Sequence, residues 1–175
     1  MDRLKRRLAG GDSAAFAELY DRIADGIFHY LVTQTGTRED AADLLQETFL
    51  RIYRARDRLS EVDHLKSYCF RIAHNEMLRW RKSHRGQPAS GQLLYELADQ
   101  GDMLSLDARE VVGGALDRLP PHYRQVVELK FFSGLTFAEI GQVLDRPQGT
   151  VATWYRRAME QLEANVQLDK ERGRL

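Results

Sequence analysis

The chain has 175 residues and a mass of 20.2 kDa, with 26 basic and 26 acidic side chains and therefore no formal net charge. That length suits one domain or two small ones, and the single cysteine, Cys69, excludes an intramolecular disulfide and a multi-cysteine metal site. No apolar stretch approaches the roughly 18 residues that a membrane span needs, so we expect a cytoplasmic protein without a membrane span.

Helical periodicity of the apolar residues predicts three helices in the first half of the chain, at about residues 13–32, 38–56 and 63–83. Asp12 or Ser13 is a suitable N-cap for the first helix, and Gly36 interrupts the pattern after it. Thr37 offers a cap for the second helix.

The second predicted helix has an apolar side and a polar side. A buried stripe is predicted from Leu45, Phe49, Ile52 and Tyr53. The other side carries Asp43, Gln46, Glu47, Leu50 and Arg54.

A basic stretch, residues 71–85, covers the end of the third predicted helix. Its cations are Arg71, Arg79, Arg81, Lys82 and Arg85, with Glu76 as the one acidic residue and Phe70 and Trp80 interleaved. Such a composition suits a nucleic-acid surface, because cations contact phosphates and aromatic rings stack on bases. A solvated helix face has a similar composition, so both interpretations stay open at this point.

The composition changes over residues 86–107, which lack Lys and Arg and begin with Gly, Pro and Ser. We therefore expect a flexible linker there, between a first lobe at 13–85 and a second lobe at 108–163. The second lobe has predicted helices from about 108 to just before Pro120, then at 122–132, 136–144 and 147–162. The polar residues 164–175 are expected to form a frayed tail.

The strongest local signal is a helix pair at residues 136–163. Thr136 and Glu139 have the spacing of a capping box, and Pro147 suits the start of the next helix. The second helix has a predicted core stripe of Val151, Tyr155, Ala158 and Leu162. Its remaining residues face solvent or a ligand: Gln148, Thr150, Ala152, Thr153, Arg156 and Arg157. A helix-turn-helix of this kind enters the DNA major groove, although an ordinary helical hairpin has the same pattern.

Together these elements predict an all-α fold of two small helical domains joined by a flexible linker. The five histidines lack metal-ligand spacing, and the sequence has neither a glycine-rich phosphate loop nor a nucleophile–base constellation. We therefore expect no metal, no cofactor and no enzyme activity.

Six stretches of the chain occur in a characteristic order around the predicted linker. They are Phe16–Tyr20, Asp43–Leu50, Tyr68–Asn75, Ala115–Pro120, Gly134–Gly141 and Pro147–Val151. In this order the chain resembles bacterial RNA polymerase sigma factors of the extracytoplasmic-function (ECF) class, whose two lobes are called regions 2 and 4. The resemblance covers about residues 13–85 and 108–163.

The resemblance implies a role in promoter-specific transcription initiation. Region 2 would dock on the clamp of the largest subunit of core RNA polymerase through Asp43, Gln46, Glu47 and Leu50. The loop at about 58–65 and the helix after it would recognise the −10 promoter element and hold a flipped base. Residues implied in −10 contact and strand melting are His64, Lys66, Arg71, Asn75, Arg79, Trp80, Arg81, Lys82 and Arg85.

Region 4 would read the −35 element through the exposed residues of the second helix of the pair: Gln148, Thr150, Ala152, Thr153, Arg156 and Arg157. An anti-sigma protein is a further implied partner. The chain departs from the family pattern at Arg79, where many relatives have Asp or Asn, and at 152–154, where a Lys-Ser-Arg run is frequent.

Two other functions remain compatible with the residues. One is a helix-turn-helix regulator that binds duplex DNA independently of polymerase. The other is a module that docks on polymerase or a regulator without melting DNA.

Overall fold

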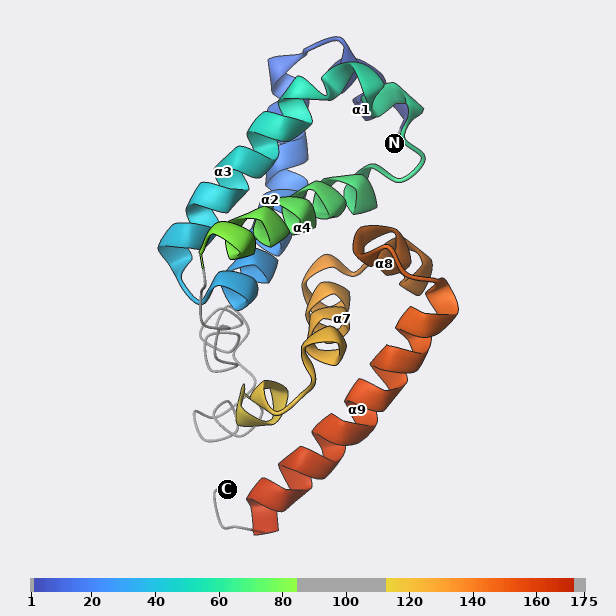
Figure 1. Ribbon diagram of the computed structural model, residues 1–175. Coiled ribbons are helices and arrows are strands. Elements are labelled where there is room, and N and C mark those ends of the chain that lie inside the picture. Colours follow the sequence, from blue (N-terminus) through green and yellow to red (C-terminus); the bar gives the residue numbers. More distant parts are fainter. Residues whose placement is uncertain (1, 85–112, 172–175) are drawn as a thin grey trace.

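The computed structural model describes residues 2–84 and 113–171, which are helical and contain no strand (Figure 1). The N-terminal lobe, residues 2–84, consists of α1 (Asp2–Ala9), α2 (Ser13–Thr35), α3 (Arg38–Arg54), the 3-10 helix η1 (Arg56–Glu61) and α4 (Leu65–Ser83). The C-terminal lobe, residues 113–171, begins with a helical stretch at 113–117 and continues with α7 (Pro121–Ser133), α8 (Phe137–Leu144) and α9 (Gln148–Glu171). The all-α prediction is confirmed, while the predicted linker at 86–107 and Arg85 lie outside the described residues. None of the helices in the described ranges combines the length and apolar character that a membrane crossing requires.

Local side-chain chemistry sets the helix boundaries in the N-terminal lobe. The Asp12 carboxylate accepts hydrogen bonds from the first backbone amides of α2, and Gly36 ends this helix in a left-handed conformation with φ of 85°. Thr37 then accepts a hydrogen bond from the Asp40 amide at the start of α3. These predicted caps are confirmed.

Two short elements, α1 and η1, were not predicted. They pack against each other, and the side chains of Leu4, Leu8 and Leu59 are buried. Lys5 Nζ donates to the Val62 carbonyl at 2.7 Å. An eight-residue helix has too few apolar positions for a clear periodicity, so tertiary packing stabilises α1.

The last helix is longer than predicted, because α9 continues to Glu171 instead of ending near Leu162. Its last turns are held by the start of the lobe: Asn165 Nδ2 donates to the Ala115 carbonyl at 3.2 Å, and Arg118 pairs with the buried Asp169 at 2.5 Å. The expectation of a frayed tail is therefore wrong for residues 164–171, because contacts distant in sequence stabilise them.

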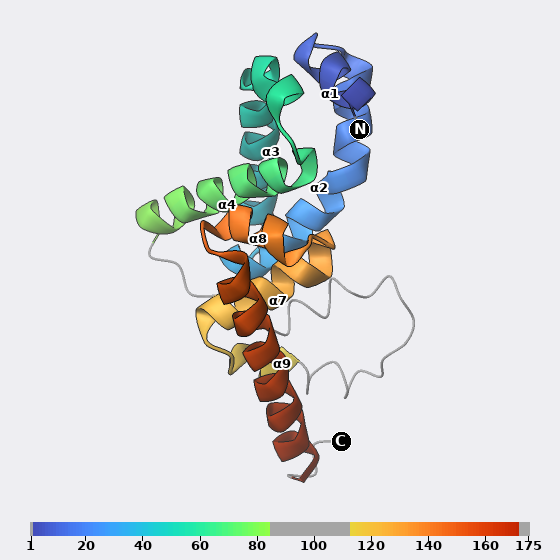
Figure 2. The same ribbon diagram turned by 90° about the vertical axis from the view of Figure 1, so that its right-hand side faces the viewer.

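The two lobes share one buried apolar cluster, which nothing in the sequence indicated. In it α7 lies against α2, and α8 lies against α4 (Figure 2). Gly26 permits the closest approach, since a Cβ there would lie 2.8 Å from the Phe132 carbonyl oxygen. The lobes are therefore tightly packed on each other as well as separately folded.

A buried polar group lies within this interface. The hydroxyl of Tyr30 is 2.8 Å from His74 Nδ1, and Gln125 of α7 donates to the same hydroxyl at 3.1 Å. Burial lowers the pKa of His74 to about 4. His74 is thus a neutral core histidine and does not contribute to the exposed basic stretch.

A second polar group in the interface surrounds Glu128 of α7. Its carboxylate accepts hydrogen bonds from Gln34 of α2 and from Arg124, the latter at 2.6 Å. Burial raises the pKa of Glu128 to about 7 despite the opposing effect of Arg124. Both lobes therefore depend on each other to satisfy buried polar groups.

Candidate polymerase and nucleic-acid interfaces

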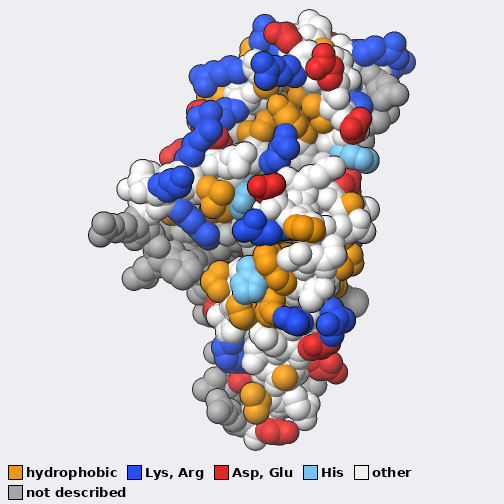
Figure 3. All heavy atoms as spheres, turned by 45° about the vertical axis from the view of Figure 1, so that its right-hand side comes forward, with side chains coloured by type: hydrophobic (Ala, Val, Ile, Leu, Met, Phe, Trp, Pro, Cys, Tyr) orange, Lys and Arg blue, Asp and Glu red, His pale blue; other side chains and the backbone are white. Residues whose placement is uncertain are grey.

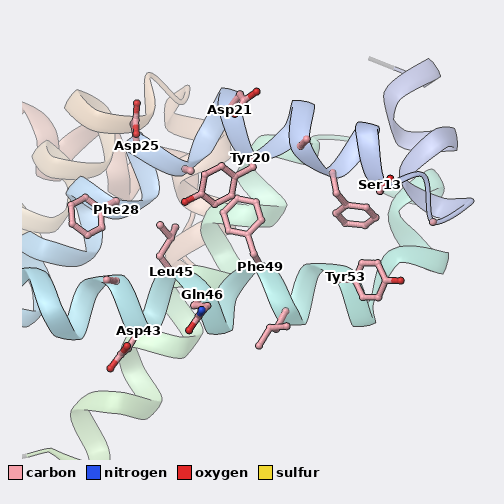
Figure 4. Close-up of a pocket in the computed structure, with 16 residues that line it drawn as sticks. Ser13, Tyr20, Asp21, Asp25, Phe28, Asp43, Leu45, Gln46, Phe49 and Tyr53 are labelled. Atoms are coloured by element: carbon pink, nitrogen blue, oxygen red, sulfur yellow. The ribbon is translucent and has the colours of Figure 1, made fainter.

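A groove of about 1090 Å³ runs between α2 and α3, with aromatic side chains along both walls (Figure 4). The rings of Tyr20 and Phe49 are 4.8 Å apart, and those of Phe16 and Tyr53 are 5.0 Å apart. The groove can therefore accept apolar side chains of a partner.

Three of the four residues predicted to dock on polymerase line this groove: Asp43, Gln46 and Leu50. The fourth, Glu47, is instead held by Arg51 at 3.2 Å and by Arg54 at 3.6 Å. The structure thus brings the predicted acidic and apolar docking residues to one edge, with Glu47 beside them in an ion-pair cluster.

The opposite wall and the end of the groove were missed by the sequence reasoning. Tyr53 was predicted to be buried but is 46% exposed, and Tyr20, within the apolar pattern of α2, is 47% exposed. Asp21 and Asp25 add acidic groups on the α2 side. Periodicity identifies which side of a helix faces a neighbour, but it does not report how closely that neighbour approaches.

The predicted −10 surface lies on α4. Arg71, Asn75 and Arg79 are exposed and follow one another at intervals of four, so they form one stripe along the helix. The N-terminal lobe, at the top of Figure 3, carries gathered Lys and Arg side chains. Arg79 is oriented by Glu76, whose Oε1 lies 2.5 Å from its Nη1.

The other predicted −10 residues vary in exposure. His64, Arg81 and Lys82 are exposed, whereas Lys66 and Trp80 are half-buried. Trp80 stacks on His84 with ring centroids 5.0 Å apart. Phe70, which the sequence placed among the basic residues, is fully buried in the core and cannot stack on a base.

Beside this stripe is a cleft of about 720 Å³ between the end of α3, η1 and α4. Arg51, Arg54 and Arg58 line it together with Asn75 and Arg79. These three arginines were not predicted to face DNA, because they come from a different element and only the tertiary structure brings them to α4.

A smaller cavity of about 340 Å³ lies where the loop at 61–64 meets α4. His64 and Arg71 line it with Tyr68, and the Arg71 guanidinium lies 5.5 Å from the Tyr68 ring. This cavity, called the −10 cavity below, coincides with the place predicted for a flipped base. One of its lining residues, Gln142, comes from α8 of the other lobe.

The helix pair in the C-terminal lobe has the predicted local geometry. Thr136 and Glu139 form a capping box, and Asp145 ends α8 in the left-handed conformation with φ of 54°. A Cβ on Gly141 would lie 2.5 Å from the Arg146 carbonyl oxygen, so the turn requires glycine there. The tight helix-turn-helix geometry is therefore confirmed.

The predicted −35 residues occupy the first half of α9. Gln148, Arg156 and Arg157 are exposed, whereas Thr150, Ala152 and Thr153 are half-buried. Val151 and Ala158 are buried as predicted, with Tyr155 and Leu162 only partly buried. Trp154 packs on His122 of α7 with ring centroids 4.8 Å apart, so its ring faces the lobe.

Comparison with known families assigns both lobes. Residues 19–87 match the family model for sigma-70 region 2, and residues 109–162 match that for sigma-70 region 4. The chain is 29% identical to the ECF RNA polymerase sigma factor SigW of Bacillus subtilis, with 92% of this chain and 94% of the relative covered. It is 26% identical to the ECF RNA polymerase sigma-E factor of Haemophilus influenzae, with 94% of each chain covered.

Solved structures have the same fold. CnrH, in complex with the cytosolic domain of CnrY, superposes with a TM-score of 0.70 at 24% identity, covering 96% of this chain and 97% of that one. The sigma factor RpoE of Bartonella quintana, in complex with the anti-sigma factor NepR, superposes with a TM-score of 0.67 at 20% identity, covering 88% and 98%.

Proposed function

Because the chain belongs to the sigma-70 family and to its ECF class, it is a sigma factor for RNA polymerase, and we propose how its surfaces divide the work of initiation. The observation that carries this proposal is the presence, in one chain, of an acid-rimmed apolar groove, a cationic helix with a cavity beside it, and a helix-turn-helix.

The groove between α2 and α3 docks on the clamp of the largest polymerase subunit. Its aromatic walls suit an apolar ridge, and the carboxylates of Asp21, Asp25 and Asp43 suit basic side chains on the flanks of that ridge. Leu50 and Tyr20, each about half exposed, are the expected anchors.

The α4 surface opens and reads the −10 element. Flipping a base out of the duplex costs a few kcal/mol, which a fitting cavity and cationic surroundings offset. The −10 cavity supplies the first, and the stripe of Arg71, Asn75 and Arg79 supplies a path for the strand. Arg51, Arg54 and Arg58 extend the cationic surface toward the backbone phosphates.

The start of α9 reads the −35 element in the major groove. Gln148 and the exposed Arg156 and Arg157 are placed to contact base edges and phosphates. The half-buried Thr150, Ala152 and Thr153 make fewer contacts, so we expect readout there to depend in part on DNA shape.

The chain itself makes and breaks no bond, since the chemistry of initiation belongs to the polymerase, and we place it in the cytoplasm with its template. An anti-sigma protein is a further proposed partner, as RpoE of Bartonella quintana is solved with the anti-sigma factor NepR.

Transcription from a panel of genomic promoters tests this function, using core polymerase with and without the chain. We expect initiation that depends on the chain at a subset of promoters, and melted thymines at the −10 element by permanganate footprinting. Initiation without melting would favour a docking module, and tight sequence-specific duplex binding without polymerase would favour an independent regulator.

A further inference from the structure

We propose that the free chain holds itself closed, with α8 of the C-terminal lobe covering the −10 cavity of the N-terminal lobe, so that the lobes must part before a promoter is read. This inference rests on the proposed function and concerns the regulation of the same DNA-binding surface.

The first observation is what α8 presents to the cavity. Gln142 lines it, and its Oε1 accepts a hydrogen bond from Ser67 Oγ at 3.1 Å. Glu139 lies 3.6 Å from His64 Nδ1, and the charge of Lys66 also acts on its carboxylate. An amide offers the donors and acceptor of a base edge, and a carboxylate has the charge sign of a phosphate. The helix α8 thus occupies this surface with the chemistry of a nucleotide.

A second predicted DNA contact is engaged in the same way. Arg81 Nη2 donates to the carbonyl and to the side-chain Oε1 of Gln34, at 3.2 and 2.8 Å. The amide of Gln34 in turn donates to Glu128 of α7. Arg81 is therefore tied to the C-terminal lobe through one intermediate residue.

The contact between the lobes is apolar enough to persist without a partner. Val126, Leu129, Ile140 and Val143 of the C-terminal lobe are at most 2% exposed within the shared cluster. Parting the lobes exposes apolar surface to water, which favours the closed arrangement of the free chain.

The closed arrangement cannot read both promoter elements at once. Their names place them about 25 base pairs apart, or roughly 85 Å along B-form DNA. Gln142 touches Ser67, and the few residues from Gln142 to Gln148 reach at most about 20 Å. The chain between residues 84 and 113 reaches up to about 100 Å when extended, so its length permits the lobes to part.

A single substitution can open the contact without touching a DNA-binding residue. In Gly26→Ala the added Cβ would lie 2.8 Å from the Phe132 backbone oxygen, and backbone cannot yield as a flexible side chain does. Alanine also suits the interior of α2 better than glycine, so the N-terminal lobe itself should fold. Gly114→Ala is the matched control, because its nearest contact is an ordinary 3.7 Å to Arg118 Nη1.

Energy transfer between dyes on Glu39→Cys and Gln161→Cys reports the state of the lobes in the full chain, since both positions are exposed. Cys69 stays in place, because burial raises the pKa of its thiol to about 12 and makes it unreactive. We expect high transfer in the free chain, a fall on adding core polymerase, and low transfer in free Gly26→Ala but not in Gly114→Ala.

Binding of single-stranded DNA tests the occlusion itself. The probe is an oligonucleotide that copies the non-template −10 strand of a promoter activated by the chain. We expect Gly26→Ala to bind it about tenfold more tightly than the unchanged chain, as the open fraction rises. Gln142→Ala, at an exposed position, should shift binding in the same direction and serves if Gly26→Ala fails to fold.

Low transfer in the unchanged free chain, or unchanged transfer and DNA binding in both folded variants, would overturn the proposal. If the free chain shows high transfer but no promoter responds to it with core polymerase, the proposed function fails and the closed state stands. Gly26→Ala should retain promoter-directed transcription, because the open form is the one that initiates.

Discussion

Leu50 is a half-exposed leucine on an otherwise polar helix face, and its position at the groove between α2 and α3 gives it a specific expected effect. Leu50→Asp should weaken binding to core polymerase at least tenfold, about 1.4 kcal/mol or more, because it places a charge where an apolar contact is expected. The melting temperature should not fall, since the side chain is 47% exposed.

Leu168→Asp is the control for this substitution, since Leu168 is 50% exposed on α9, away from the groove. Titration of labelled core polymerase measures both variants. Equal affinities for the two would remove the groove as the docking surface.

Gly141 shows how a single backbone approach fixes the helix-turn-helix. Gly141→Ala would place a methyl group 2.5 Å from the Arg146 carbonyl oxygen. We expect a loss of about 1–3 kcal/mol in the free energy of unfolding, which exceeds the gain in helix propensity. Gly149→Ala meets no atom within 4 Å and should be neutral or slightly stabilising in the same urea titration. A similar change in both variants would show that the close approach has no energetic weight.

At the scale of the element, α9 depends on one buried ion pair for its last turns. Asp169→Asn leaves Arg118 without its charged partner, so we expect faster amide hydrogen exchange over residues 163–171. Glu160→Gln removes an exposed pair with Arg156 on the same helix and should have no measurable effect. Uniform exchange rates along α9 in Asp169→Asn would contradict this role.

The buried acid of α7 makes the stability of the whole molecule depend on pH. Glu128 has its pKa raised to about 7, so the folded state binds a proton more tightly than the unfolded state does. Its contribution is therefore complete at pH values below about 4.5 and is lost as the pH rises toward 7, by about 3 kcal/mol in all. The lowered pKa of His74 acts in the opposite sense, with stability lost as the pH falls from 6.5 to about 4.

Comparing the unchanged chain with Glu128→Gln separates these two effects. The difference in their free energies of unfolding should decline between pH 4.5 and 7, and Glu128→Gln alone should become more stable as the pH rises from 4 to 6.5. Urea unfolding at several pH values measures this, and a difference independent of pH would mean that Glu128 stays ionised in the folded state.

The sequence by itself determined the helices from α2 to α4 and α7 to α9, together with their caps and the helix-turn-helix. These features depend on residues within four positions of one another, as at Asp12, Thr37 and the capping box of Thr136 and Glu139. The tertiary structure alone decided the depth of the groove, the arginines beside α4, the length of α9 and the contact between the lobes. Each of these joins side chains that are far apart in the chain, such as Ser67 with Gln142 and Gln34 with Glu128, and no local pattern encodes how closely two helices approach.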